Sequence, residues 1–142
     1  MSRFVFNCVV IGILMPTFLV SAKLPDWVSD DMIEMVAEDK ARCLGETGAT
    51  QGLIDEVNEG KLPTDKSLAC YMYCLFESLS LVDEDGVLDY EMIAGFLPDD
   101  MQSTATNILG ACAAQPGADN CEKMYNIGVC VQAKDPSMFF ML

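Results

Sequence analysis

The segment Cys70-Tyr71-Met72-Tyr73-Cys74 decides how this chain folds. Its two cysteines stand four residues apart, so on a helix their side chains lie on the same face. Each cysteine can therefore tie that helix to a different neighbouring helix. Turn and cap residues precede the segment at Pro63, Thr64 and Asp65, and they predict a helix from Lys66 to about Val82. This stapled helix is the expected centre of the fold.

The rest of the chain alternates helical patterns with turn residues. No stretch alternates cleanly between apolar and polar residues, so we expect an all-α fold without strands. Five further short helices are predicted from their caps and breakers. They are one opened by the capping box of Asp31 and Glu34 that runs toward Leu44 and breaks at Gly45 to Gly48; one from Thr50 to Gly60; one from Asp89 to Phe96; one from Pro98 and Asp99 to near Ala114; and one capped by Asn120 that reaches about Lys134 before Pro136.

The N-terminal segment, residues 1–22, has the pattern of a secretory signal peptide. Arg3 supplies a positive start, an apolar run follows from Val9 to Val20, and small residues end the segment at Ala22. The alternative is a transmembrane anchor, but the run is shorter than the ~20 apolar residues that a bilayer needs. We therefore expect cleavage after Ala22, which leaves one domain, residues 23–142, in a secreted, extracellular protein.

The cysteine count indicates disulfides. Seven cysteines are present, and Cys8 would leave with the signal peptide. An even number in a short secreted chain is typical of a disulfide framework, here of three bridges. A zinc site is the alternative, but the spacing lacks the paired hooks of zinc modules and the chain has no histidine. Six cysteines allow many pairings, and spacing alone does not choose among them. They are Cys43, Cys70, Cys74, Cys112, Cys121 and Cys130.

Charge and the missing histidine argue against several functions. The chain has 22 acidic and 8 basic residues, a formal net charge of −14 that becomes −15 once Arg3 leaves with residues 1–22. Such a field repels phosphate backbones and anionic surfaces, so we expect neither nucleic acid nor a membrane as partner. Without histidine we expect no catalytic residues, no metal and no cofactor. The acidic turn from Asp83 to Gly86 has Leu81 and Met92 where a calcium loop needs acids, which argues against calcium.

Apolar residues are abundant for so charged a chain, since 51% of the residues are hydrophobic. Methionine adapts to irregular shapes, so the many methionines together favour a lined cavity over ordinary core packing. The tail Ser137–Leu142 has five apolar residues among its six, and an exposed tail of this kind would promote aggregation. We expect it to fold back and to cover or enter an apolar pocket, its end at Leu142 meeting a polar partner. The alternative is a frayed, loosely packed tail.

The cysteine spacing resembles that of a known family. The pattern C-x26-C-x3-C-x37-C-x8-C-x8-C spans the expected mature chain and resembles the six-cysteine signature of insect odorant-binding proteins, the pheromone-binding and general odorant-binding family. Five segments strengthen the resemblance, in particular to honeybee antennal pheromone-binding members. They are Asp26-Trp27-Val28, residues 36–43, residues 70–75, residues 80–83 and Cys130-Val131-Gln132.

The resemblance implies six α-helices around an internal apolar cavity. It implies disulfides that join Cys43 with Cys74, Cys70 with Cys121, and Cys112 with Cys130. It also implies a carrier that binds hydrophobic odorants, pheromones or fatty-acid-like molecules in sensillar lymph. An olfactory receptor and a second copy of the chain, as a homodimer, are the macromolecular partners that it suggests. By similarity, the ligand-binding residues would be Trp27, Met32, Met35, Val36, Leu75, Leu79, Leu81, Leu97, Phe139 and Phe140.

Two other classes of function stay open. A secreted signalling or venom protein that acts through its surface would lack a large internal cavity. A carboxylate-based enzyme would need two carboxylates in opposed environments within one cleft. The presence and the lining of a cavity therefore discriminate among a carrier, a surface-acting protein and an enzyme.

Overall fold

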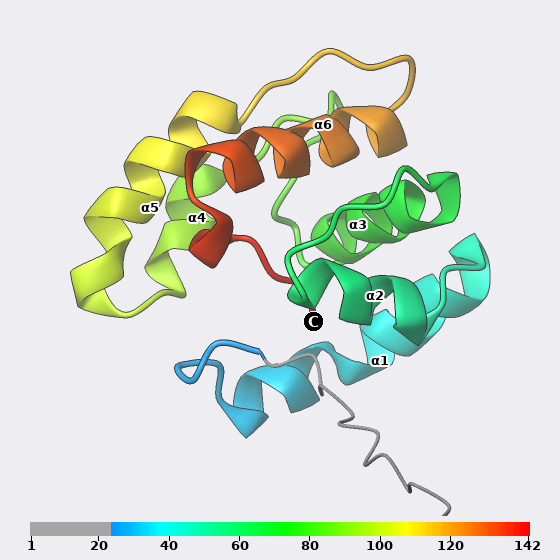
Figure 1. Ribbon diagram of the computed structural model, residues 1–142, viewed down its shortest axis with the longest axis horizontal. Helices are drawn as coiled ribbons and strands as arrows, with labels where there is room; N and C mark the ends of the chain where they lie inside the picture. Colours follow the sequence, from blue (N-terminus) through cyan, green and yellow to red (C-terminus); the bar gives the residue numbers. More distant parts are fainter. Residues whose placement is uncertain (1–23) are drawn as a thin grey trace, which may run out of the picture.

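The computed structural model describes residues 24–142, and the expected signal peptide lies outside the described residues. Over this range the chain forms six α-helices and one short 3₁₀-helix (Figure 1), which confirms the all-α fold. The pairing that resembles a strand is a single isolated bridge between Val82 and Leu88. The elements are α1 (Asp30–Thr47), α2 (Gln51–Asn58), α3 (Lys66–Ser78), α4 (Tyr90–Gly95), α5 (Asp99–Cys112), α6 (Asn120–Lys134) and η1 (Pro136–Met138).

The N-cap of helix α1 is Ser29, two residues before the cap at Asp31 that the sequence predicted. The Ser29 backbone is extended, and its Oγ accepts a hydrogen bond from the Met32 amide at 3.2 Å. The prediction of a cap at Asp31 is therefore wrong. The helix also continues through Gly45 to Thr47, and it ends only at Gly48, whose φ of 74° is left-handed.

Helix α3 ends at Ser78, so its predicted continuation to Val82 is wrong. Ser80 has a φ of 57°, and the chain turns there. Leu81 and Val82 are buried, but they belong to a return segment in which the Asp89 amide donates to the Leu81 carbonyl at 2.9 Å. The polar turn at Asp83 follows, and the Asp83 Oδ1 accepts hydrogen bonds from two amides further along the turn.

The two ends of the loop between α5 and α6 also differ slightly from expectation. Helix α5 ends at Cys112 rather than near Ala114, and Asp119 rather than Asn120 caps α6, accepting from the Glu122 amide at 2.9 Å. The Asn120 side-chain Nδ2 instead donates to the Glu84 carbonyl at 3.0 Å and to the Tyr73 hydroxyl at 3.1 Å. It thereby fastens the start of α6 to the Asp83 turn.

Three disulfides join four of the helices, in the pairing that the family resemblance implied. Cys43–Cys74 ties α1 to α3, Cys70–Cys121 ties α3 to α6, and Cys112–Cys130 ties α5 to α6. Helices α3 and α6 therefore each carry two bridges to different partners. We call these four linked helices the disulfide frame.

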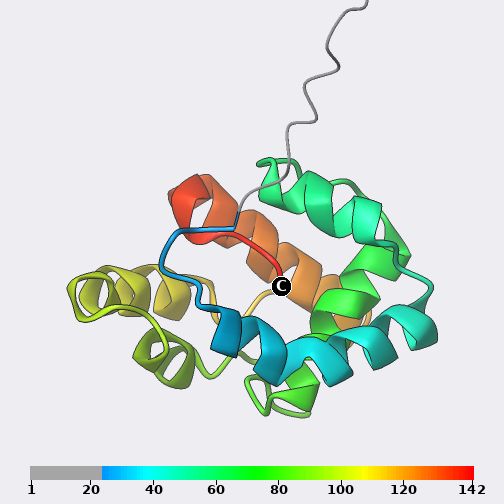
Figure 2. The ribbon, with the colours of Figure 1, turned by 90° about the horizontal axis from the view of Figure 1, so that it is seen from below.

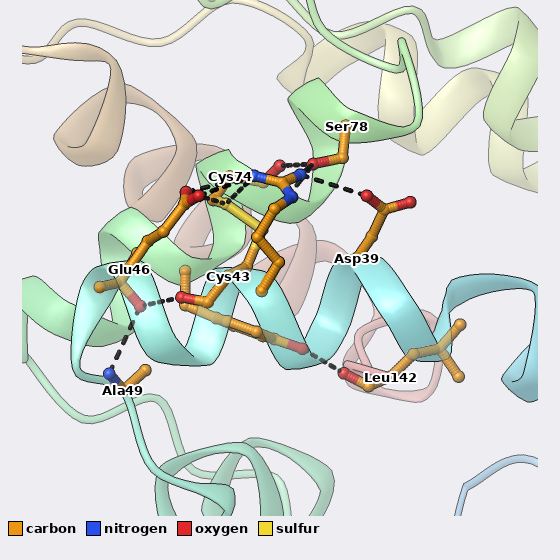
Figure 3. Close-up of a disulfide and its surroundings, with 10 residues drawn as sticks. Asp39, Cys43, Glu46, Ala49, Cys74, Ser78 and Leu142 are labelled. Carbon is orange, nitrogen blue, oxygen red and sulfur yellow. Dashed lines mark hydrogen bonds and ion pairs between the residues drawn. A yellow bond between two sulfur atoms is a disulfide. The ribbon is translucent and has the colours of Figure 1, made fainter.

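A polar cluster strengthens the link between α1 and α3 (Figure 3). Arg42 of α1 lies 3.2 Å from the carboxylates of Asp39 and of Glu46, and its guanidinium also donates to the Ser78 hydroxyl on α3. The hydrogen bonds to Asp39 and then to Glu46 raise the pKa of Arg42 above its usual value. Because these side chains are exposed, the ion pairs add little stability beside the Cys43–Cys74 disulfide.

The core lies between α3 and α6, and the C-terminal tail enters it. The side chains of Leu68, Tyr71 and Met72 on α3 and of Met124 on α6 are almost completely buried. After α6 the chain turns through η1 and runs back among the helices, and its end lies at the centre of the view in Figure 2. The fold-back that was predicted for the tail is confirmed, since Met141 is only 3% exposed.

Candidate ligand-binding cavity

An apolar cavity of about 330 Å³ lies inside the ring of helices. Side chains from α1, α3, α4, α5 and α6, from the segment before α1, and from the tail contribute to its wall. The lining residues are Trp27, Met32, Met35, Val36, Met72, Leu75, Phe76, Leu79, Leu81, Leu88, Ile93, Phe96, Leu97, Leu109, Met124, Ile127, Gly128, Val131, Met138, Phe139, Phe140, Met141 and Leu142.

All ten residues that the sequence singled out as ligand-binding lie on this wall. They come from six places in the chain, which only the folded structure brings together. Trp27 precedes α1; Met32, Met35 and Val36 are on α1; Leu75 is on α3; Leu79 and Leu81 follow α3; Leu97 follows α4; and Phe139 and Phe140 belong to the tail.

Thirteen further residues line the cavity and were missed. The cavity face of α6 is the largest omission, with Met124, Ile127, Gly128 and Val131. Their spacing of three or four residues is that of one helix face, so periodicity could have indicated them. Met72 and Phe76 on α3 are four residues apart, so periodicity could have indicated them as well.

The tail forms one wall and is held by polar contacts at its end. The Asn58 side chain of α2 donates to the Met141 carbonyl at 2.9 Å and accepts from the Met141 amide at 2.8 Å. The Tyr71 hydroxyl donates to the main-chain oxygen of Leu142 at 2.7 Å (Figure 3). These bonds supply the polar partners that were expected for the end of the tail.

Tyr71 is fully buried on α3, and its environment favours the neutral phenol. Burial raises the pKa of Tyr71 to about 12 from the ordinary value of 10.0. The hydroxyl therefore remains a hydrogen-bond donor to Leu142 at every physiological pH.

The segment before α1 closes the cavity against the tail. The rings of Trp27 and Phe140 meet edge to face with centroids 5.2 Å apart, a favourable arrangement for two aromatic rings. The wall is also partly open to solvent. Met35 of α1 is 61% exposed and Phe96 at the end of α4 is 53% exposed, so these two apolar side chains mark the rim of the opening.

A second hollow, of about 390 Å³, lies on the surface where α3 and α6 begin. An ion pair forms part of its wall, with the Lys66 Nζ 2.8 Å from the Asp119 Oδ2. The hydrogen bond between them lowers the pKa of Asp119 and raises that of Lys66. Although this hollow is no smaller than the internal cavity, its exposed and charged wall is that of ordinary protein surface, and we assign ligand binding to the apolar cavity.

The chemistry of the cavity wall is that of binding without bond formation. Aliphatic, thioether and aromatic side chains make up the wall, and they stabilise a ligand by removing its apolar surface from water. Within residues 24–142, no group of three or more His, Cys, Asp or Glu side chains is placed to hold a metal ion. No helix in that range is long and apolar enough to cross a membrane.

A small helical domain that is cross-linked by disulfides and encloses an apolar cavity defines a class: the binding proteins for hydrophobic small molecules. Comparison with known families agrees, because residues 26–134 match the PBP/GOBP family. The chain belongs to this family of odorant-binding carrier proteins, whose members are not enzymes.

Individual relatives support the assignment. General odorant-binding protein 69a of Drosophila melanogaster is 31% identical over 104 residues, which are 72% of this chain and 70% of that protein. The solved structure of Apis mellifera odorant binding protein 5 matches with a TM-score of 0.68 at 26% identity, over 81% of this chain and 98% of that one. The medfly odorant binding protein CcapOBP22/CcapOBP69a matches with a TM-score of 0.62 at 26% identity, over 72% and 89%.

Proposed function

We propose that this protein is a secreted carrier that takes hydrophobic odorants or pheromones into its cavity, keeps them dispersed in sensillar lymph and delivers them to olfactory receptors. The observation that carries the proposal is the internal cavity of about 330 Å³ with an apolar wall. Its volume is within the range of small-molecule sites in proteins. The ten predicted wall residues, from Trp27 to Phe140, are the proposed ligand contacts.

The expected affinity follows from burial. A ligand with a chain of about ten carbons gains about 8 kcal/mol when all of its methylenes leave water. Lost translational and rotational freedom reduces this gain by several kcal/mol, so a dissociation constant in the micromolar range is expected. Methionine side chains in the wall can change rotamer to suit ligands of different shape, which favours binding of several related compounds.

The wall also favours neutral ligands. Moving a carboxylate from water into apolar surroundings costs several kcal/mol unless a partner compensates it. We therefore infer that alcohols, esters and hydrocarbons bind more tightly than fatty acids of the same length at neutral pH. The difference should shrink as the pH falls toward the pKa of the acid.

A displacement assay tests the carrier function. A fluorescent apolar probe is bound to the protein, and decan-1-ol, decanoic acid, glucose and a nucleotide compete with it at pH 7.5. Decan-1-ol should displace the probe at micromolar concentration, decanoic acid should do so less well, and glucose and the nucleotide should not. If no apolar compound competes, the protein is not such a carrier.

A matched pair of variants shows whether binding occurs in the cavity. Leu79→Trp places a large ring at the wall and should weaken probe binding, because the ring takes up ligand space. Val129→Trp adds the same ring at an exposed position of α6 that does not line the cavity, and it should leave binding unchanged. Equal effects of the two variants would contradict binding in this cavity.

A further inference from the structure

One glycine on the cavity face of α6 has neighbouring side chains that would have to move if a side chain were added there. A Cβ atom built at Gly128 would lie 2.9 Å from the Met72 Cε and 2.9 Å from the Phe139 Cζ. These separations are too short for carbon atoms, so the ring of Phe139 and the methyl group of Met72 lie directly on the bare backbone of α6. All three residues line the cavity.

The other helical glycines show that this contact is particular to the cavity. Gly45 in α1 and Gly95 in α4 have open space where a Cβ would stand. Gly110 in α5 faces the ring of Tyr90, but its nearest contact would be 3.3 Å, and neither residue lines the cavity. Within the described helices, Gly128 is the glycine whose Cβ would meet neighbouring side chains at less than 3.0 Å.

The main chain on both sides of Phe139 is held in place. Behind it, the Phe139 amide donates to the Pro136 carbonyl at 3.3 Å. Ahead of it, Phe140 meets Trp27, and Met141 is held by both polar atoms of the Asn58 side chain. A side chain at position 128 would therefore push the ring into the space that the ligand would use.

We propose that Gly128 is a specificity-determining position that, together with Phe139, sets the length of ligand the cavity accepts. Because α6 carries no side chain there, the tail can seat its aromatic ring against the helix backbone and leave the adjacent space open. A methyl group at position 128 moves the ring inward and shortens that space. The proposal rests on the carrier function proposed above and adds the residue that tunes it.

A series of straight-chain alcohols from hexan-1-ol to dodecan-1-ol tests the proposal by probe displacement. Gly128→Ala should weaken binding of dodecan-1-ol by about tenfold, the effect of leaving roughly two methylenes unburied, and should change hexan-1-ol by less than about twofold. Gly110→Ala is the matched control, a methyl group facing an aromatic ring away from the cavity, and it should leave the length profile unchanged.

Rescue and reversal complete the test. Phe139→Leu in the Gly128→Ala background should restore binding of dodecan-1-ol, because the smaller side chain gives back the space. Phe139→Leu alone should shift the profile toward longer alcohols, and this variant decides the question if Gly128→Ala does not fold. A loss that is equal at all lengths, or a profile that moves in none of these variants, would overturn the proposal. A wild-type protein that binds no alcohol at all would instead overturn the carrier function.

Discussion

The disulfide frame and the tail enclose the same cavity by different means. Helices α1, α3, α5 and α6 are joined by covalent bonds between residues 18 to 51 positions apart. The tail is held by hydrogen bonds from Asn58 and Tyr71 and by ring packing on Gly128 and Trp27. A disulfide stabilises by about 2–4 kcal/mol and a hydrogen bond by about 1 kcal/mol. The tail is therefore held by weaker bonds than the helices of the disulfide frame.

The largest effect is expected in the frame. Replacing Cys70 and Cys121 together with alanine removes the bridge with the longest sequence separation, 51 residues, and should lower the free energy of unfolding by about 4 kcal/mol. Replacing Cys112 and Cys130, which are 18 residues apart, should cost about 3 kcal/mol. Urea denaturation of both variants measures the two values. If either variant is as stable as the wild type, the disulfides do not hold the frame more strongly than hydrogen bonds hold the tail.

Removing the tail should affect binding more than folding. A protein without Met138–Leu142 loses five apolar side chains that line the cavity, among them the buried Met141. Its affinity for the apolar probe should fall by at least about thirtyfold, or about 2 kcal/mol. Its unfolding free energy should fall by less than in the Cys70 and Cys121 variant. Unchanged probe affinity would mean that the tail only covers the cavity and contributes no binding surface.

A smaller effect is expected when the tail keeps its side chains and loses one anchor. Asn58→Ala removes both hydrogen bonds to Met141 and should weaken probe binding and unfolding stability by about 1–2 kcal/mol. Gln51→Ala on the same helix removes an exposed side-chain hydrogen bond to Asp55 and serves as the control. Calorimetry and probe titration of the pair measure the difference, and equal losses would contradict a specific anchor at Asn58.

The smallest effect near neutral pH is expected at Tyr71, which also gives the stability a dependence on alkaline pH. Tyr71→Phe should cost about 1 kcal/mol near neutrality through the lost bond to Leu142. In the wild type the folded protein keeps the Tyr71 proton up to about pH 12, whereas the unfolded chain loses it near pH 10. The free energy of unfolding should therefore fall as the pH rises through this window.

Denaturation at pH 9 to 12, together with tyrosinate absorbance, checks this dependence. Tyr71→Phe should lose the part of the alkaline decline that Tyr71 causes, and Tyr90→Phe on α4 should keep it. If both variants follow the wild-type profile, the buried phenol of Tyr71 does not control the alkaline stability.

The fold could be anticipated because its signals are local, and the errors occur where local signals compete. Ser29 and Asp31 are both good cap residues, and the extended backbone at Ser29 decides between them. Leu81 and Val82 continue the apolar pattern of α3, but their burial beside Leu88 takes them out of the helix. The disulfide pairing came from the family resemblance, since cysteine spacing alone allows many pairings.

The cavity could be anticipated only in part. The ten predicted residues were those that the family resemblance implied, and they make up part of the wall. The face of α6 with Met124, Ile127 and Val131 is periodic, but the same periodicity describes a helix packed against a solid core. The sequence gives no sign that Gly128 matters. Its role depends on the ring of Phe139, eleven residues further on, which the folded tail places against α6.

The methionines of the wall make the cavity sensitive to oxidants. Six of the lining residues are methionines: Met32, Met35, Met72, Met124, Met138 and Met141. Oxidation converts the thioether to a polar sulfoxide and proceeds fastest where the sulfur is accessible. Met35, 61% exposed at the rim, would react before the buried Met72 and Met124. Peroxide in the surrounding fluid would thus place a polar group at the mouth of the cavity while its interior stays apolar, and sulfoxide reduction would reverse the change.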